Sequence, residues 1–145
     1  MKLLDANVLL YAYDASAAHH PACRGWLERI FNEEEPVGLP WQTLLAFVRI
    51  VSNPRAVRNP LASASACALV EEWLARPQAV IVEPGERFWS LFRKVVDTAQ
   101  VGGPLVTDAA LAALALEHGA VLCSTDRDFR RFDGLKLCDP SVPQT

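Results

Sequence analysis

The stretch Leu105–Phe129, LVTDAALAALALEHGAVLCSTDRDF, decides the fold that the sequence predicts. Its segment Thr107–His118 is rich in Ala and Leu, as helices are; its first residue suits an N-cap, and Gly119 follows as a helix stop. The short apolar run after Gly119 predicts a strand. The stretch therefore places Asp108 at the start of a helix and Asp126 at the end of the strand that follows it.

Short apolar segments and longer segments with helical spacing alternate along the rest of the chain. Lys2–Leu4 is predicted to form a buried first strand, with Asp5 at its carboxyl end and Asn7 in the turn that follows. Strands that alternate with helices predict an α/β fold with a parallel sheet covered on both faces. The other predicted elements are helices from His19 to before Pro36 and at Trp41–Ser52, Ser63–Arg76 and Glu86–Ala99, a strand at Ala79–Val82, a short turn or helix at 127–132, and an edge strand at Leu135–Cys138.

The length and composition indicate a globular chain with one core. Its 145 residues suffice for a single domain spanning residues 1–145, and 51% of them are hydrophobic against 21% charged. No apolar run reaches the ~18 residues of a membrane span, so no membrane association is expected. No Cys-x-x-Cys pair is present, and we expect a cytoplasmic protein with reduced thiols at Cys23, Cys67, Cys123 and Cys138.

The charge balance restricts the kinds of partner. A formal net charge of -3 argues against a generally basic nucleic-acid-binding protein. The cations are 11 Arg and 3 Lys, and Arg can contact phosphate or carboxylate through two parallel hydrogen bonds. This bias is compatible with an RNA substrate, with an acidic protein partner, or with codon composition alone.

Three acids are predicted to meet at one edge of the sheet. Asp5 ends the first strand, Asp126 ends a later strand, and Asp108 opens the helix that leads to that later strand. The carboxyl ends of parallel strands share one edge, where ligands commonly bind. Each acid alone has an ordinary explanation, because Asp108 would favour a helix N-terminus by ~0.3–1 kcal/mol, and acids such as Asp126 and Asp128 are frequent in turns. Their joint placement favours one shared site.

The chemistry of such a cluster points to a metal ion. Three carboxylates within a few ångströms repel one another and stay ionised together only beside a cation. Oxygen ligands without His or Cys favour Mg²⁺, with Mn²⁺ as a possible substitute, over Zn²⁺. Mg²⁺ shares its ligand positions with phosphate oxygens and supports phosphodiester hydrolysis. We therefore predict a catalytic metal site made by Asp5, Asp108 and Asp126.

Three segments resemble the acidic motifs of PIN domains: LLDANVLLYAYD at 3–14, LVTDAALAALALEHGA at 105–120 and CSTDRDFRRF at 123–132. More closely, they resemble VapC-type toxins of bacterial type II toxin–antitoxin systems. LPWQTLLAFVRIVSNPR at 39–55 is similar to the second helix and loop of one VapC subgroup. The resemblance spans nearly the whole chain and implies a PIN-like three-layer α/β/α sandwich with a central, mainly parallel sheet.

The resemblance also implies a function. It implies a Mg²⁺-dependent endoribonuclease that cleaves RNA phosphodiester bonds and so inhibits translation and growth. It implies a cognate VapB-type antitoxin, a homodimer and a toxin–antitoxin hetero-oligomer. The matching residues are Asp5, Asp108 and Asp126 as metal-binding acids, Asp128 as a further acid that ligates through water or holds the site, and Asn7 and Thr125 as polar residues beside the metals.

The second helix departs from the family pattern. Many members have a glutamate there in an Ala-Glu-Phe-like context, whereas this sequence has Leu45-Ala46-Phe47. The missing carboxylate favours one tightly held Mg²⁺, with a second brought by the RNA, over a fully occupied two-ion site. The RNA backbone is expected to be steered by arginines, for which the candidates are Arg49, Arg55, Arg58 and Arg127.

Two other functions are compatible with parts of the sequence. A degenerate PIN domain would bind RNA or an antitoxin with little or no cleavage, and Ala46 motivates this alternative. A phosphatase of the haloacid dehalogenase type needs Asp-x-Asp-x-Thr after its first strand, but Asn7 and Leu9 stand at the later two positions. An amphipathic antitoxin helix could pack on apolar faces that carry Trp, although most of the four Trp side chains are expected in the core: Trp26, Trp41, Trp73 and Trp89.

Overall fold

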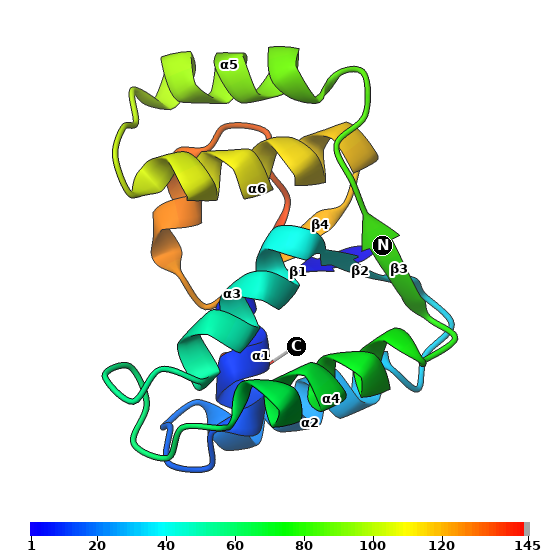
Figure 1. The fold of residues 1–145 in the computed structure, drawn as a ribbon. Helices are drawn as coiled ribbons and strands as arrows, with labels where there is room; N and C mark the ends of the chain where they lie inside the picture. The colour runs from blue at the N-terminus through cyan, green and yellow to red at the C-terminus, as the bar shows by residue number, and fades with distance from the viewer. Residues whose placement is uncertain (144–145) are drawn as a thin grey trace.

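The computed structural model describes residues 1–143, and its centre is a sheet of five strands (Figure 1). All neighbouring strands run parallel, in the spatial order β3-β2-β1-β4-β5. Their carboxyl ends therefore share one edge of the sheet. The strands are β1 (Lys2–Leu4), β2 (Val37–Pro40), β3 (Ala79–Val82), β4 (Val121–Cys123) and β5 (Leu137–Cys138).

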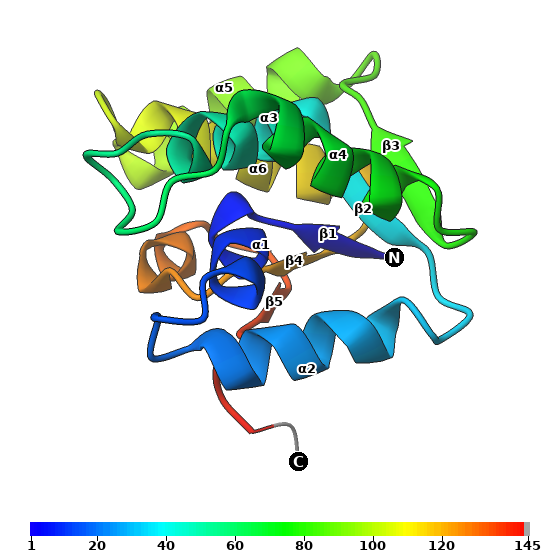
Figure 2. The ribbon, with the colours of Figure 1, turned by 60° about the horizontal axis from the view of Figure 1, so that its bottom comes forward.

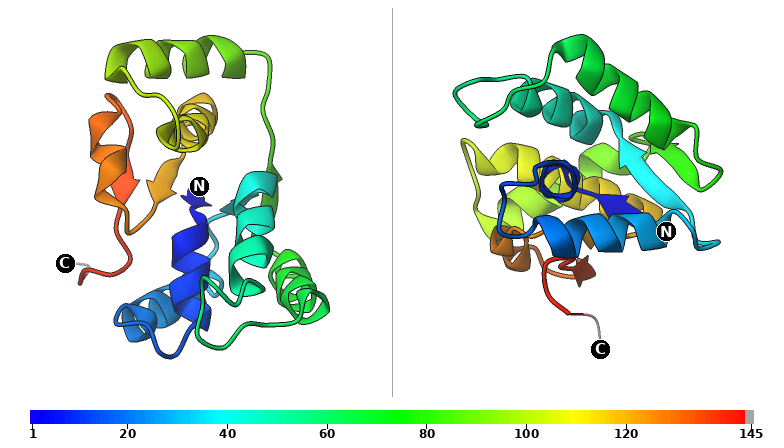
Figure 3. Two further views of the ribbon diagram at one scale, coloured as in Figure 1. Left: turned by 60° about the vertical axis from the view of Figure 1, so that its left-hand side comes forward. Right: turned by 90° about the horizontal axis from the view of Figure 1, so that it is seen from below.

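Helices cover both faces of the sheet and complete three layers, as the sequence predicts (Figures 1 and 2). The helices α1 to α4 pack on one face, and α5, α6 and the 3₁₀ helix η1 pack on the other. Figure 3 shows α5 lying over α6. The bounds are α1 (Ala6–Tyr13), α2 (His20–Ile30), α3 (Trp41–Val51), α4 (Ser63–Leu74), α5 (Phe88–Ala99), α6 (Leu105–His118) and η1 (Arg127–Arg131).

Two apolar cores lie on the two faces, because successive residues of a strand point to opposite sides. Leu4 packs with Trp26 and Phe47 under α1 to α4. Its neighbour Leu3 packs with Leu122 beneath α5 and α6. Full burial of such a side chain contributes about 1.5–3 kcal/mol, so the two cores fix the sheet between the helical layers and hold its carboxyl edge in place.

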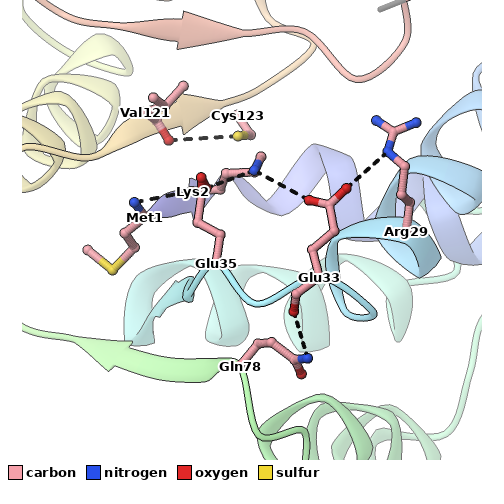
Figure 4. Close-up of polar contacts among 8 residues, drawn as sticks. All are labelled: Met1, Lys2, Arg29, Glu33, Glu35, Gln78, Val121 and Cys123. Carbon is pink, nitrogen blue, oxygen red and sulfur yellow. Dashed lines mark hydrogen bonds and ion pairs between the residues drawn. The ribbon is translucent and has the colours of Figure 1, made fainter.

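Charged side chains gather at the opposite, amino edge of the sheet (Figure 4). The Lys2 ammonium lies 2.7 Å from Oε2 of Glu35 and 3.9 Å from Oε2 of Glu33. Arg29 approaches Glu33 to 3.7 Å, and the Gln78 amide donates a hydrogen bond to the Glu33 carbonyl. Surface pairs of this kind contribute only ~0–1 kcal/mol each. They lie at the end of the sheet away from the acids that follow β1 and β4.

The structure differs from the sequence-based prediction at three points. Residues 6–13 form α1 directly after Asp5, so Asn7 lies in a helix and not in a turn. The fully buried strand β2 is not predicted at all. Helix α6 begins before Thr107, whose hydroxyl donates to the Pro104 carbonyl, so the N-cap prediction for Thr107 is wrong. The other predicted helices and strands are confirmed, with changes of a few residues at their ends.

The tryptophans divide between core and surface. Trp26 is buried at 3% exposure and Trp73 is half-buried, but Trp41 is 47% exposed and Trp89 is 68% exposed. The expectation that most of them lie in the core is therefore wrong for Trp41 and Trp89. Within residues 1–143, no helix combines the length and the apolar content that a membrane crossing requires.

Candidate metal centre

Four acidic side chains lie at the carboxyl edge of the sheet, each placed there by a different local structure. Asp5 directly follows β1 and caps the N-terminus of α1. Asp126 follows β4 and caps η1, whose first turn contains Asp128. Asp108 lies in the first turn of α6. Because α6 leads back to the start of β4, its own start lies at the edge where β4 ends.

Asp108, Asp126 and Asp128 have the spacing of metal ligands. One carboxylate oxygen from each lies within 4.8 Å of the other two, and among residues 1–143 no other three acids, histidines or cysteines meet this criterion. The sequence-based trio is Asp5, Asp108 and Asp126, so the structure adds Asp128 to the close group. Asp128 also pairs with Arg131, whose Nη2 lies 3.1 Å from its Oδ1.

Asp5 stands beside this group with both of its oxygens already engaged. Its Oδ1 accepts a hydrogen bond of 2.7 Å from the backbone N–H of Ala6, and its Oδ2 accepts one of 2.8 Å from the Ser124 hydroxyl. Asp5 and Asp108 line one groove of about 450 Å³. Asp5 is therefore held rigidly, with its carboxylate facing the same space as Asp108.

The acids repel one another in the absence of a cation. Partial burial raises the pKa of Asp108 to about 6, and the charges of Asp5, Asp126 and Asp128 add to the rise, while Arg131 opposes it. Burial also raises the pKa of Asp5, and the Asp126 charge adds to this, although the hydrogen bonds from Ser124 and Ala6 lower it. The edge therefore carries an excess of negative charge, which a bound cation would neutralise.

Ser124 connects the acids, and sequence reasoning missed it. Its hydroxyl oxygen accepts hydrogen bonds from the Asn7 amide (3.1 Å) and the Asp126 backbone N–H (3.0 Å), and its O–H donates a hydrogen bond to Asp5. Thr125, predicted as the supporting residue, contributes its backbone N–H to Asn7 Oδ1 at 3.2 Å. The available signal was the order Ser-x-Asp-x-Asp-Phe at 124–129, in which Ser124 stands two positions before Asp126.

Helix α3 forms the second wall of the groove. Gln42, Leu45, Ala46 and Arg49 line the groove together with Asp5 and Asp108. Ala46 therefore faces the acids from the position where a glutamate was expected, and α3 contains no acid that replaces it. Leu45 is 66% exposed beside Ala46.

The four candidate arginines are not equally placed. Arg49 lines the groove of Asp5 and Asp108. Arg127 lines a smaller cavity of about 150 Å³ that also contains Asp126. Arg58 lies near Asp14 at the far end of α1, and Asp14 is about 14 Å along the helix from Asp5. Neither Arg58 nor Arg55 lines either space. Of these four candidates, Arg49 and Arg127 are therefore the two that line a space together with one of the acids.

The donor set fits a hard divalent cation. The side chains that converge at this edge offer carboxylate, hydroxyl and amide oxygens, and His and Cys are not among the close group. Such oxygen ligands suit Mg²⁺ or Mn²⁺ better than Zn²⁺. The elevated pKa of Asp108 also favours cation binding, because a bound cation stabilises the ionised form of carboxylates that repel one another.

Comparison of the whole sequence with known proteins gives consistent matches. The family model for the PIN domain matches residues 2–135. The VapC ribonuclease Mb2897 of Mycobacterium bovis is 41% identical over 145 residues, which cover 100% of this chain and 99% of the relative. Ribonuclease VapC37 of Mycobacterium tuberculosis is 41% identical over 140 residues, or 97% of each chain.

Solved structures with the same fold are more distant in sequence. The structure of VapBC-1 from nontypeable Haemophilus influenzae matches with a TM-score of 0.72 at 17% identity, covering 97% of this chain and 98% of the other. Mycobacterium tuberculosis VapC20, described as a Sarcin-Ricin loop cleaving toxin, matches with a TM-score of 0.63 at 14% identity, covering 94% and 99%. At these identities the likeness concerns the fold alone.

Proposed function

The chain belongs to the PIN-domain family, and from this premise we propose that it is a VapC-type toxin, a metal-dependent endoribonuclease that cleaves RNA phosphodiester bonds and so inhibits translation and growth. The observation that carries the proposal is the meeting of Asp108, Asp126 and Asp128 at one edge of the sheet in a chain whose full-length relatives are ribonucleases. Residues 1–145 act as a single PIN domain in this proposal, in the cytoplasm where RNA is translated.

Asp108 and Asp126 would hold the ion directly, with Asp5 completing the site from the groove side. Asp128 would ligate through water or hold the site, since its carboxylate is shared with Arg131. A bound Mg²⁺ would activate water for attack and neutralise charge on the phosphate. In the absence of RNA, the site is proposed to hold one tightly bound ion, because Ala46 supplies no ligand from α3.

The remaining polar residues position these carboxylates and the RNA. Ser124 and Asn7 fix Asp5 against the end of β4, so that the acids from opposite ends of the chain keep their spacing. Arg49 and Arg127 flank the acids and would bind backbone phosphates on either side of the scissile bond. Arg55 and Arg58 would contribute to a more distant part of the RNA path.

The proposed partners follow from the same relatives. Structural neighbours include VapBC-1, and we assign to this chain a VapB-type antitoxin, with which it would form a hetero-oligomer, as well as a homodimer. Exposed apolar side chains on α3 and α5, Trp41 and Trp89 among them, are available for such contacts.

The function is tested by RNA cleavage with purified protein. Wild type, Asp5→Asn and Asp108→Asn are incubated with a single-stranded RNA in Mg²⁺ and in EDTA, with Asp97→Asn as the matched control. Asp97 pairs with Arg93 on the exposed side of α5, away from the edge. We expect Mg²⁺-stimulated cleavage by wild type and Asp97→Asn, and a loss of roughly 100-fold or more in the other two variants.

The same assay distinguishes the degenerate PIN domain, which Ala46 favours as the second candidate. That protein would bind RNA in a filter or gel-shift assay but would show no Mg²⁺-stimulated cleavage in any variant. Cleavage that is equal in wild type and Asp108→Asn would contradict the assignment of the site.

A further inference from the structure

Cys123 and Cys138 lie opposite each other on neighbouring strands. They are register partners in the parallel pair β4 and β5, and both belong to the sheet face that α2 covers. Neighbouring strands are about 4.8 Å apart, which lies within the roughly 4.4–6.8 Å that a disulfide allows between Cα atoms. β5 is a two-residue strand at the edge of the sheet, so it can adjust its distance from β4.

The two thiols differ in access. Cys123 is 0% exposed, and its thiol points toward the Val121 carbonyl, 3.7 Å away (Figure 4). Cys138 is half-buried and lines the 150 Å³ cavity that opens beside Asp126. The polar lining of this cavity consists of Ser124, Thr125, Asp126, Arg127, Arg130 and Asp139. A small oxidant can therefore reach Cys138 first, next to two arginines, while Cys123 is reached only from Cys138.

We propose that Cys123 and Cys138 are a peroxide-sensitive thiol pair that closes to a disulfide. The Cys138 thiolate attacks hydrogen peroxide or an organic hydroperoxide, the O–O bond breaks, and Cys138 becomes a sulfenic acid as hydroxide or alkoxide leaves. The Cys123 sulfur then attacks the Cys138 sulfur, the S–O bond breaks, and water leaves with the Cys123 proton. The protein loses two hydrogen atoms and the peroxide is reduced to two water molecules, or to water and an alcohol.

The ionisation of the pair agrees with this order of events. The contact with the Cys123 thiol lowers the pKa of Cys138 to about 7, although partial burial opposes the shift. The neighbouring Cys138 and burial raise the pKa of Cys123 above its usual value. A thiol with a pKa near the ambient pH is the best attacking group, so Cys138 reacts and Cys123 resolves.

The disulfide would act on the acidic edge through Ser124. The Ser124 backbone N–H donates to the Cys138 carbonyl over 2.9 Å, and Ser124 follows Cys123 directly. The Cα atoms of disulfide-linked cysteines are usually about 5.5–6 Å apart, more than the strand spacing, so closing the bond shifts β5 against β4. This shift moves the residue that holds Asp5 and the start of η1. This consequence rests on the proposed function: oxidation would lower RNA cleavage by roughly tenfold to a hundredfold, as misplaced catalytic groups do.

The bond itself is tested by peptide mapping, which needs no activity. Purified full chain is treated with hydrogen peroxide, alkylated, and digested without reduction, since trypsin cuts after Arg127 and Lys136 and separates the two cysteines. We expect the peptides containing Cys123 and Cys138 to be joined in wild type and in Cys67→Ser, and separate in Cys138→Ser. The exposed Cys67 is the internal control and should remain alkylated.

Other results of the peptide map and the cleavage assay would overturn either the disulfide or its effect on the acidic edge. A link from Cys138 to the buried Cys23, or oxidation of Cys67 before Cys138, would overturn the proposal. Separate peptides in a wild-type sample that melts normally would do the same. If the link forms and dithiothreitol does not restore any lost cleavage, or none is lost, the effect on the site is overturned while the disulfide stands. If reduced wild type fails to cleave RNA, the proposed function fails, and the peptide map still decides the thiol pair.

Discussion

The Ser124 hydroxyl donates a hydrogen bond of 2.8 Å to Oδ2 of Asp5, a residue 119 positions away in the sequence. The bond joins the ends of β1 and β4, the two strands that deliver acids to the edge. It also opposes the effect of burial on Asp5, because hydrogen bonds to the ionised form lower its pKa. The carboxylate is thereby kept available for a cation.

Replacement of Ser124 should show this directly. We expect Ser124→Ala to weaken Mn²⁺ binding and RNA cleavage by roughly 10- to 100-fold, as the loss of an outer partner of a metal ligand does. Ser124→Thr keeps the hydroxyl and is the matched control. Calorimetric titration with Mn²⁺ measures the affinity. Equal affinity in Ser124→Ala and wild type would rule out the positioning role.

The stability of the metal-free protein should depend on pH through Asp108. The folded pKa is about 6 and the ordinary value is 3.8, so between these values the folded state holds a proton that the unfolded chain has released. The stabilisation is therefore present at low pH and lost as pH rises through 6. We expect Asp108→Asn to raise the free energy of unfolding relative to wild type more at pH 7 than at pH 5, measured in urea with EDTA. A difference in free energy of unfolding between Asp108→Asn and wild type that is equal at both pH values, or larger at pH 5, would contradict this account.

Ala46→Glu should restore a ligand to the groove. The new carboxylate would face Asp5 and Asp108 from α3, and an added charged ligand tightens binding of a hard cation. We expect Mn²⁺ affinity to rise by roughly tenfold or more, whereas the neutral control Ala46→Gln should leave it near the wild-type value. If both variants bind Mn²⁺ alike, Ala46 does not face the ion.

Arg49→Ala should weaken RNA binding rather than metal binding. Arg49 lines the groove, and each lost phosphate contact should reduce the slope of log affinity against log salt concentration by about 0.7 for a single strand. The control is Arg93→Ala, which removes an exposed arginine paired with Asp97 on α5. RNA binding at several salt concentrations measures the slope. A slope in Arg49→Ala that matches Arg93→Ala would remove Arg49 from the RNA path.

The long, regular elements were predictable from sequence because their apolar spacing is strong. Helix α6 with Gly119 at its end and the strands β1, β3 and β4 follow from pattern alone. β2 was not predictable, because two of its four residues are Gly38 and Pro40, and both residue types are poor strand formers. Gly38 is explained only by the sheet, where an added Cβ would lie 2.9 Å from Val82.

The acids of the site were predictable from sequence, but the hydrogen bonds that link them were not. Strand ends and a helix start place Asp5, Asp108 and Asp126 at one edge, and local spacing brings Asp128 with them. Which hydroxyl points inward depends on the side of β4 from which the chain leaves, so Ser124 and Thr125 were not separable by motif. The exposure of Leu45 and Trp41 depends on the position of α3 beside the groove, which a helical period alone does not fix.

The most direct test is the anomalous diffraction of a Mn²⁺-soaked crystal of the full chain. We predict one strong Mn²⁺ peak at the carboxyl edge of the sheet, in contact with Asp108 and Asp126, and its loss in Asp108→Asn crystals grown and soaked in the same way. A peak at any other place, or an undiminished peak in Asp108→Asn, would contradict the assignment of these carboxylates as the metal centre.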